Sequence, residues 1–101
     1  MVSGQRVVEA RLSIQRALLG EVSPHLRAVV LSVDCKKIDV HFYFDGDVSE
    51  EDEESVSCIE TEILADFEPD FSICAEVIRL DYPLPISDDG FWVYQRKERA
   101  S

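Results

Sequence analysis

Apolar residues near the start of the chain recur at the spacing of an amphipathic helix. Residues 5–19 carry them at a period close to 3.6, and Gly20 follows where a helix can end. The expected buried arc consists of Val7, Val8, Ala10, Leu12, Ile14, Ala17, Leu18 and Leu19. The opposite side is formed by Arg6, Glu9, Ser13 and Arg16. Arg11 and Gln15 fall inside the arc, where a long side chain must extend its polar end to solvent.

The next two segments have strand-like patterns and predict a hairpin. Residues 26–33 are mainly apolar, whereas residues 38–45 alternate strictly between apolar and polar side chains. The side chains expected to face the core are Ile38, Val40, Phe42 and Phe44. The alternate ones, which face solvent or a partner, are Asp39, His41, Tyr43 and Asp45. Residues 34–37 make the tight connection.

A second helix is predicted over residues 50–66. The segment Asp45-Gly46-Asp47 interrupts the preceding strand, and Ser49 with Asp52 three residues later offers a capping box. The side chains expected to face the core are Val56, Ile59, Ile63 and Phe67.

The remaining residues predict two more strands. Residues 71–80 are apolar enough for a central strand, and residues 91–96 form a short last strand after an irregular, proline-containing crossing. Residues 98–101 are expected to fray. The order α-β-β-α-β-β predicts an α+β fold with two helices packed on one face of a mostly antiparallel four-stranded sheet. At 101 residues the chain is expected to form one acidic domain, residues 1–101.

Charge is distributed unevenly along the chain. The net charge is −11, yet residues 38–78 contain fourteen acids and no Lys or Arg, so that segment carries −14 and the flanks together +3. Such a field repels nucleic acid and anionic membrane, and it accelerates encounter with a basic protein. We therefore expect a basic protein partner, without nucleic acid or membrane, although acidity also serves solubility alone.

The N-terminus and the cysteines suggest a compartment. The first residues lack a secretory signal, and no apolar run is long enough to span a membrane, so we expect a cytoplasmic protein. Cys35, Cys58 and Cys74 are an odd number at wide spacing, which favours reduced thiols. We expect Cys58 and Cys74 to fill the core.

No motif predicts catalysis, a metal or a cofactor. The segment beginning at Asp45 resembles a calcium loop, but Glu50 stands where glycine is needed and Val56 where a bidentate glutamate is needed. The His and Cys residues lack zinc-site spacing. Cys35, beside Lys36 but also beside Asp34, is placed at a hairpin tip without a pocket, so we do not expect a nucleophile. The chain is therefore expected not to be an enzyme.

Two clusters are candidates for binding a partner. The first, here called the acidic belt, consists of Asp45, Asp47, Glu50, Glu51, Asp52, Glu53 and Glu54. Complementing the helix dipole explains the acids of the first turn but not the later ones, which repel one another. The second cluster is aromatic and includes Tyr82 and Trp92, residue types common at interfaces, although most aromatic residues in so small a domain belong to the core.

Several segments carry a family resemblance. They are QRALLGEV at residues 15–22, HLRA at 25–28, FYFDG at 42–46, SEEDEE at 49–54 and VIRLDYP at 77–83. Together they resemble a widespread group of short bacterial proteins similar to immunity proteins of contact-dependent growth inhibition systems. The resemblance implies a cytoplasmic protein that protects its cell by binding the toxic C-terminal domain, often a nuclease, of a large secreted protein.

Three functions are open at this point. The first is an immunity protein, a monomer or weak homodimer, that covers the active cleft of a basic toxin, because carboxylates can take the places of phosphates in such a cleft. The second is a small acidic intracellular adaptor or regulatory domain with a non-toxin partner. The third is a metal-dependent hydrolase that uses the acidic cluster.

Overall fold

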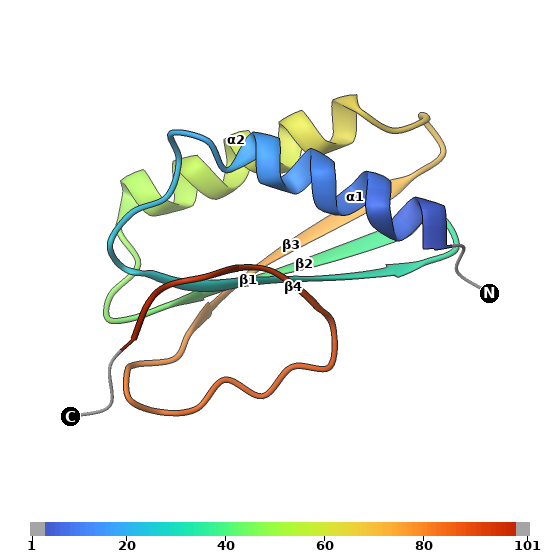
Figure 1. The fold of residues 1–101 in the computed structure, drawn as a ribbon. Coiled ribbons are helices and arrows are strands. Elements are labelled where there is room, and N and C mark those ends of the chain that lie inside the picture. Colours follow the sequence, from blue (N-terminus) through green and yellow to red (C-terminus); the bar gives the residue numbers. More distant parts are fainter. Residues whose placement is uncertain (1–3, 99–101) are drawn as a thin grey trace.

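The computed structural model describes residues 4–98. The elements are α1 (Gly4–Ala17), β1 (Leu26–Asp34), β2 (Lys37–Phe44), α2 (Glu50–Ala65), β3 (Ser72–Arg79) and β4 (Phe91–Gln95). The strands join one sheet in the order β3-β2-β1-β4. Both helices lie on one face of this sheet, and the segment between β3 and β4 runs across the other face (Figure 1). The predicted α+β fold is confirmed.

Strand pairing follows from how the chain connects the strands. β1 pairs antiparallel with β2 through a tight turn, in which Cys35 adopts a φ of 52°, and β1 also pairs antiparallel with β4. β2 and β3 are parallel, because α2 carries the chain back to the starting end of β2. The sheet is therefore mostly antiparallel, with one parallel pair.

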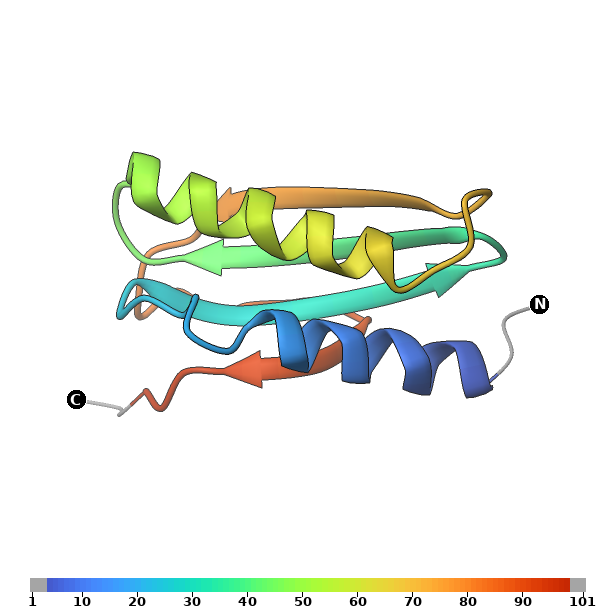
Figure 2. The same cartoon turned by 90° about the horizontal axis from the view of Figure 1, so that it is seen from above.

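The main core lies between the helices and the sheet. α2 runs along the β3–β2 side and α1 along the β1–β4 side (Figure 2). Val56, Ile59 and Ile63 of α2 are buried as predicted, and Phe67 packs partly buried against the same cluster. Burying a large apolar side chain of this kind contributes roughly 1.5–3 kcal/mol, so this larger cluster is the main source of hydrophobic stabilisation.

The buried arc of α1 is rotated relative to the prediction. Val8 and Leu12, expected in the arc, are exposed, whereas Ser13, expected on the polar side, is buried. Leu19, also expected in the arc, is exposed because α1 ends at Ala17, two residues before the predicted end of the helix. The Ser13 hydroxyl donates a 2.6 Å hydrogen bond to Asp66 at the end of α2, which compensates for its burial. The arc turns because α1 packs against α2 as well as against the sheet.

The prediction that residues 71–80 form a central strand is wrong. β3 lies at an edge of the sheet, with β2 as its neighbour. Its apolar composition has another cause, because both of its faces are partly covered. Ile73 and Ala75 pack against the core under the helices, and Ile78 packs against a second apolar cluster on the opposite face.

The prediction that Cys58 and Cys74 fill the core is also wrong. Both are exposed, and with Cys35 they are free thiols. Cys58 follows Val56 by two positions on α2 and therefore points away from the sheet. Cys74 lies on the face of β3 opposite the helices, where no helix covers it.

The second face of the sheet is covered by residues 80–90, here called the crossing segment. They lie over a small cluster whose buried members are Ala28, Val30 and Tyr43. The Asp88 carboxylate accepts a hydrogen bond from the Tyr43 hydroxyl at 2.6 Å and contacts His41 Nδ1 at 2.8 Å. The face of β2 expected to meet solvent or a partner is therefore partly covered by the chain itself.

Candidate partner-binding site

The acidic belt begins where β2 ends and continues into α2. Ser49 caps α2. Its hydroxyl accepts a hydrogen bond from the Asp52 amide at 3.1 Å, and the Asp52 carboxylate accepts one from the Ser49 amide at 3.4 Å. This is the predicted capping box. Asp52 is only 5% exposed, so within the free protein this member of the belt serves to start the helix.

Four glutamates of the acidic belt do not take part in this capping box. They are Glu50, Glu51, Glu53 and Glu54, all exposed. Within residues 4–98 no basic side chain pairs with any of them. Glutamates of the first turn complement the positive end of the helix dipole, but four carboxylates on consecutive turns also repel one another. A basic partner would relieve that repulsion.

The two aspartates of the β2–α2 loop are partly neutralised within the chain. Asp45 accepts hydrogen bonds from Arg96 Nη2 at 3.1 Å and from the Tyr82 amide at 3.2 Å. Asp47 is 94% exposed and pairs with Arg79 Nη1 at 2.5 Å. The structure therefore places Asp45 beside Tyr82, two predicted site residues that lie far apart in sequence.

Tyr82 lies next to a buried ion pair. Arg27 is only 3% exposed and forms two hydrogen bonds with the Glu98 carboxylate, from Nε at 2.7 Å and from Nη2 at 3.0 Å. Its Nη1 donates to the Leu80 carbonyl at 2.6 Å, and its guanidinium lies 5.8 Å from the centre of the Tyr82 ring. The hydrogen bond from Arg27 lowers the pKa of Glu98 and raises that of Arg27, so both groups stay charged.

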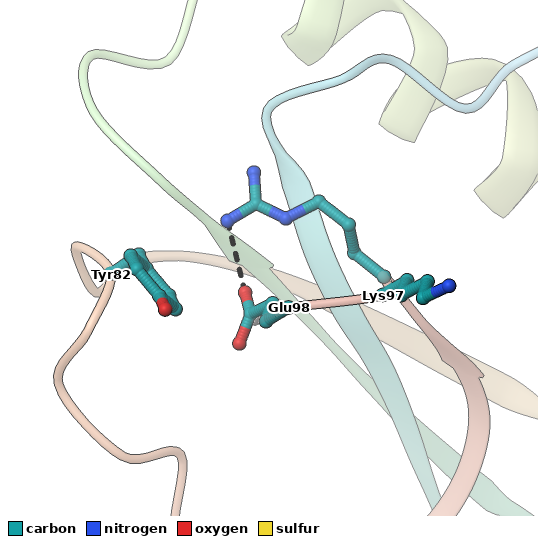
Figure 3. A pocket seen from close by; sticks show the side chains of 4 residues that line it. Tyr82, Lys97 and Glu98 are labelled. Carbon is teal, nitrogen blue, oxygen red and sulfur yellow. Dashed lines mark hydrogen bonds and ion pairs between the residues drawn. The ribbon is translucent and has the colours of Figure 1, made fainter. Parts of the chain in front are cut away.

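A small open pocket adjoins this network. It has a volume of about 200 Å³ and is lined by Tyr82, Arg96, Lys97 and Glu98. In Figure 3 the Tyr82 ring stands across from the Glu98 carboxylate, while the Lys97 amine points away from both. Arg96 links the pocket to the belt, because its Nη2 contacts Glu98 at 2.9 Å as well as Asp45.

Trp92 lies apart from the other predicted site residues. It packs partly buried in the cluster beneath the crossing segment, and its indole N–H donates to the Asp88 carbonyl at 3.3 Å. These contacts give Trp92 a role in holding the crossing segment on the sheet. Its assignment to a binding surface stays a prediction, as do those of Tyr82 and the acidic belt.

The sequence prediction missed the network around Arg27. One signal was available: Arg27 is the only charged residue between Leu26 and Val33, in an otherwise apolar strand. A charge in such a position requires a partner. The partner Glu98 could not be inferred, and its expected fraying is wrong, because two arginines hold it. The other residues expected to fray, 99–101, lie outside the described part of the chain.

The described residues supply neither a metal site nor a membrane span. Across residues 4–98 no three His, Cys, Asp or Glu side chains gather closely enough to hold a metal ion. In the same range, neither helix has the length and apolar character needed to cross a membrane.

One comparison with known proteins assigns a family. The family model for the MafI2 immunity protein matches residues 7–98, which include every strand, α2 and most of α1. No curated protein matches the chain. The match covers the Arg27–Glu98 pair, the acidic belt and the crossing segment within a single alignment. The chain therefore belongs to the MafI2 immunity protein family.

Proposed function

We propose that this protein binds the toxin of its own toxin–immunity pair and neutralises it by covering the toxin's active cleft. Membership of an immunity protein family supports the toxin as partner. The observation that carries the binding mode is the set of four exposed, unpaired glutamates at the start of α2. Such a surface complements a basic cleft, and inhibition requires only that carboxylates occupy it.

The proposal includes the toxin's chemistry and location. A basic cleft is what a nuclease needs to hold phosphates, so a nuclease is the toxin that this surface fits best. Inhibition by occupation needs no catalytic group, metal or cofactor in the immunity protein. The resemblance to contact-dependent growth inhibition systems extends the proposal to a toxin delivered between cells and neutralised in the cytoplasm of the producing cell.

The test uses the C-terminal domain of a candidate toxin, taken from a gene that neighbours this chain's gene and purified with its catalytic residue substituted. Stopped-flow association is measured at increasing NaCl concentration. We expect tight binding and an association rate that falls with salt, because screening shortens the field to about 8 Å at physiological ionic strength and about 3 Å at 1 M. Co-expression with the active toxin is expected to restore growth. Absence of binding together with absence of protection would refute the proposal.

A further inference from the structure

The two edges of the sheet differ in how they discourage pairing with another chain. β4 is 5 residues long, and its pairing with β1 contains a register shift. β3 is 8 residues long and keeps an uninterrupted parallel register with β2. It contains no proline and no lysine, and Glu76 is its only charge before the terminal Arg79. Protein edges are usually protected by shortness, bulges, proline or charged side chains, and of these β3 has only Glu76 and the terminal Arg79.

The hydrogen bonds at the ends of β3 identify the backbone groups that point away from the sheet. The Ser72 amide donates to the Lys36 carbonyl at 2.8 Å, and the Leu80 amide donates to the Phe44 carbonyl at 2.8 Å. Both donors occupy even-numbered positions. Because successive residues of a strand direct their backbone groups to opposite edges, the even-numbered amides of β3 face β2.

The odd-numbered residues therefore present their backbone groups to the open edge. Ile73, Ala75 and Val77 form a row of donors and acceptors without a neighbouring strand in residues 4–98. Their side chains lie on the helix face, where Ile73 and Ala75 pack against the core and Val77 is partly exposed. An added strand would pair with this row and cover Val77.

The negative charge near the open edge of β3 favours a basic strand over a second copy of this chain as the partner. Glu76 projects from β3 with its side chain 61% exposed, and the surrounding segment 38–78 contains no Lys or Arg. Two copies of this chain joined at β3 would bring two segments of charge −14 together, which like-charge repulsion opposes. A basic strand would instead place its cations beside Glu76 and near the acidic helix.

We propose that the open edge of β3 receives a β-strand of a basic partner protein, which extends the sheet by one strand. This inference rests on the proposed function, with the toxin domain as that partner, and adds the way it docks. The amides and carbonyls of Ile73, Ala75 and Val77 pair with the toxin's backbone. A Lys or Arg of the added strand contacts Glu76.

Amide exchange read by NMR tests the pairing residue by residue. The probe is the inactivated toxin domain described above, with the ¹⁵N-labelled full chain. In the free protein we expect the amides of Cys74 and Glu76 to exchange slowly, because they face β2, and those of Ile73, Ala75 and Val77 to exchange quickly. In the complex we expect slow exchange at all of these positions.

Two substitutions test the same edge by affinity. Ala75→Pro removes an outward amide without removing a bond to β2, a placement that edge strands accept. Val77→Lys places a positive charge on the edge, and Thr61→Lys on the exposed side of α2 is its charge-matched control. We expect the two β3 variants to weaken toxin binding by about tenfold or more, and the control by less than about threefold. Circular dichroism verifies that each variant folds. If Ala75→Pro does not fold, the affinity of Val77→Lys alone tests whether the β3 edge binds the toxin.

The outcomes separate this inference from the function on which it rests. If the toxin binds but the three amides still exchange quickly, or both β3 variants bind as the parent does, the edge is not the docking site and the proposed function stands. If the parent does not bind, both fall. If the three amides are already protected in concentrated free protein and lose protection on dilution, a second copy occupies the edge, which overturns the proposal.

Discussion

The hydroxyl of Tyr43 donates a 2.6 Å hydrogen bond to Asp88 and so joins the middle of the sheet to the crossing segment. Burial and this bond raise the pKa of Tyr43 to about 12, from an ordinary value of 10.0. Asp88 is also partly buried, which opposes ionisation, but hydrogen bonds from Tyr43, His41 and the Gly90 amide outweigh burial and lower its pKa. The pair is therefore most stable as a neutral phenol with a carboxylate.

Stability is predicted to decline at alkaline pH through Tyr43. Because its folded pKa lies above its unfolded one, its contribution is complete below pH 10 and is lost as the pH rises from about 10 to about 12. The rise of its pKa from 10.0 to about 12 corresponds to at most roughly 3 kcal/mol. Tyr43→Phe is expected to remove this dependence and to cost about 1 kcal/mol at pH 7. Urea unfolding of the parent and of Tyr43→Phe between pH 7 and 11.5 measures this pH dependence. If the free energies of unfolding of the two proteins change in parallel with pH, Tyr43 is not the group responsible.

Stability is also predicted to decline at acid pH, because protonation of Asp88 weakens its hydrogen bond with Tyr43. The folded pKa of Asp88 lies below the ordinary 3.8, so its contribution is complete above pH 3.8 and is lost as the pH falls through the lowered value. In Asp88→Asn the decline in the free energy of unfolding below pH 4 is expected to be shallower than in the parent. Acid titrations followed by circular dichroism compare the two, and identical slopes would exclude Asp88 as a contributor.

Gly90 is predicted to tolerate no side chain. A Cβ at this position would lie 2.7 Å from the Leu31 carbonyl oxygen and 2.7 Å from Val30 Cγ1, so the chain could not return beside β1 without moving backbone. We expect Gly90→Ala to lower the free energy of unfolding by about 1–3 kcal/mol. Gly4→Ala is the control, since Gly4 begins α1 and a Cβ there meets nothing within 4 Å, and it should change stability by less than about 1 kcal/mol. Thermal denaturation compares the two, and equal effects would contradict the predicted clash.

The Arg27–Glu98 pair is predicted to matter far more than an exposed ion pair. Arg27→Met leaves the Glu98 carboxylate without its closest cation and should cost roughly 2–4 kcal/mol. Arg79→Met, which breaks the exposed pairs with Asp47 and Asp81, should cost far less, because solvent screens both pairs. Urea midpoints measure both, and similar losses would show that burial adds little to the Arg27–Glu98 pair.

Local patterns were sufficient to predict most of the fold. The alternation in residues 38–45, the capping residues Ser49 and Asp52 and the helical spacing after them each depend on near neighbours. The order of strands and the packing of α1 depend instead on distant ones. Ser13 can be buried because Asp66 accepts its hydrogen bond. A local sequence pattern cannot predict a hydrogen-bond partner so far along the chain.

The candidate site was predictable only in part, for the same reason. The exposure of Glu50, Glu51, Glu53 and Glu54 follows from helical periodicity. Asp52 is buried because it caps α2. The sequence prediction treated all seven acids of the belt as equivalent and so did not separate Asp52 from the exposed ones. The position of Tyr82 beside Asp45 arises because the end of β3 meets the end of β2. The sequence therefore indicated the acids but not the surface that they share.

Charge reversal tests the proposed binding surface directly. In the quadruple variant Glu50→Lys, Glu51→Lys, Glu53→Lys and Glu54→Lys, we expect the association rate with the toxin domain to fall about tenfold or more, since steering spans that range. The fold should survive, because these side chains are exposed. A control variant, Glu9→Lys on α1 with Glu21→Lys in the following loop, should change the rate less. Unchanged kinetics would move the search to the pocket beside Tyr82 and, separately, to the surface around Trp92.

The position of β1 between β2 and β4 has a consequence for the order of folding. β1 meets β2 through a two-residue turn, a contact that closes a very short loop at little entropic cost. It meets β4 only after α2, β3 and the crossing segment, so the pairing of Leu31 with Phe91 closes a loop through most of the chain. Such distant pairings are slow to form. The hairpin is therefore positioned to form early, and we expect β4 to join the sheet last.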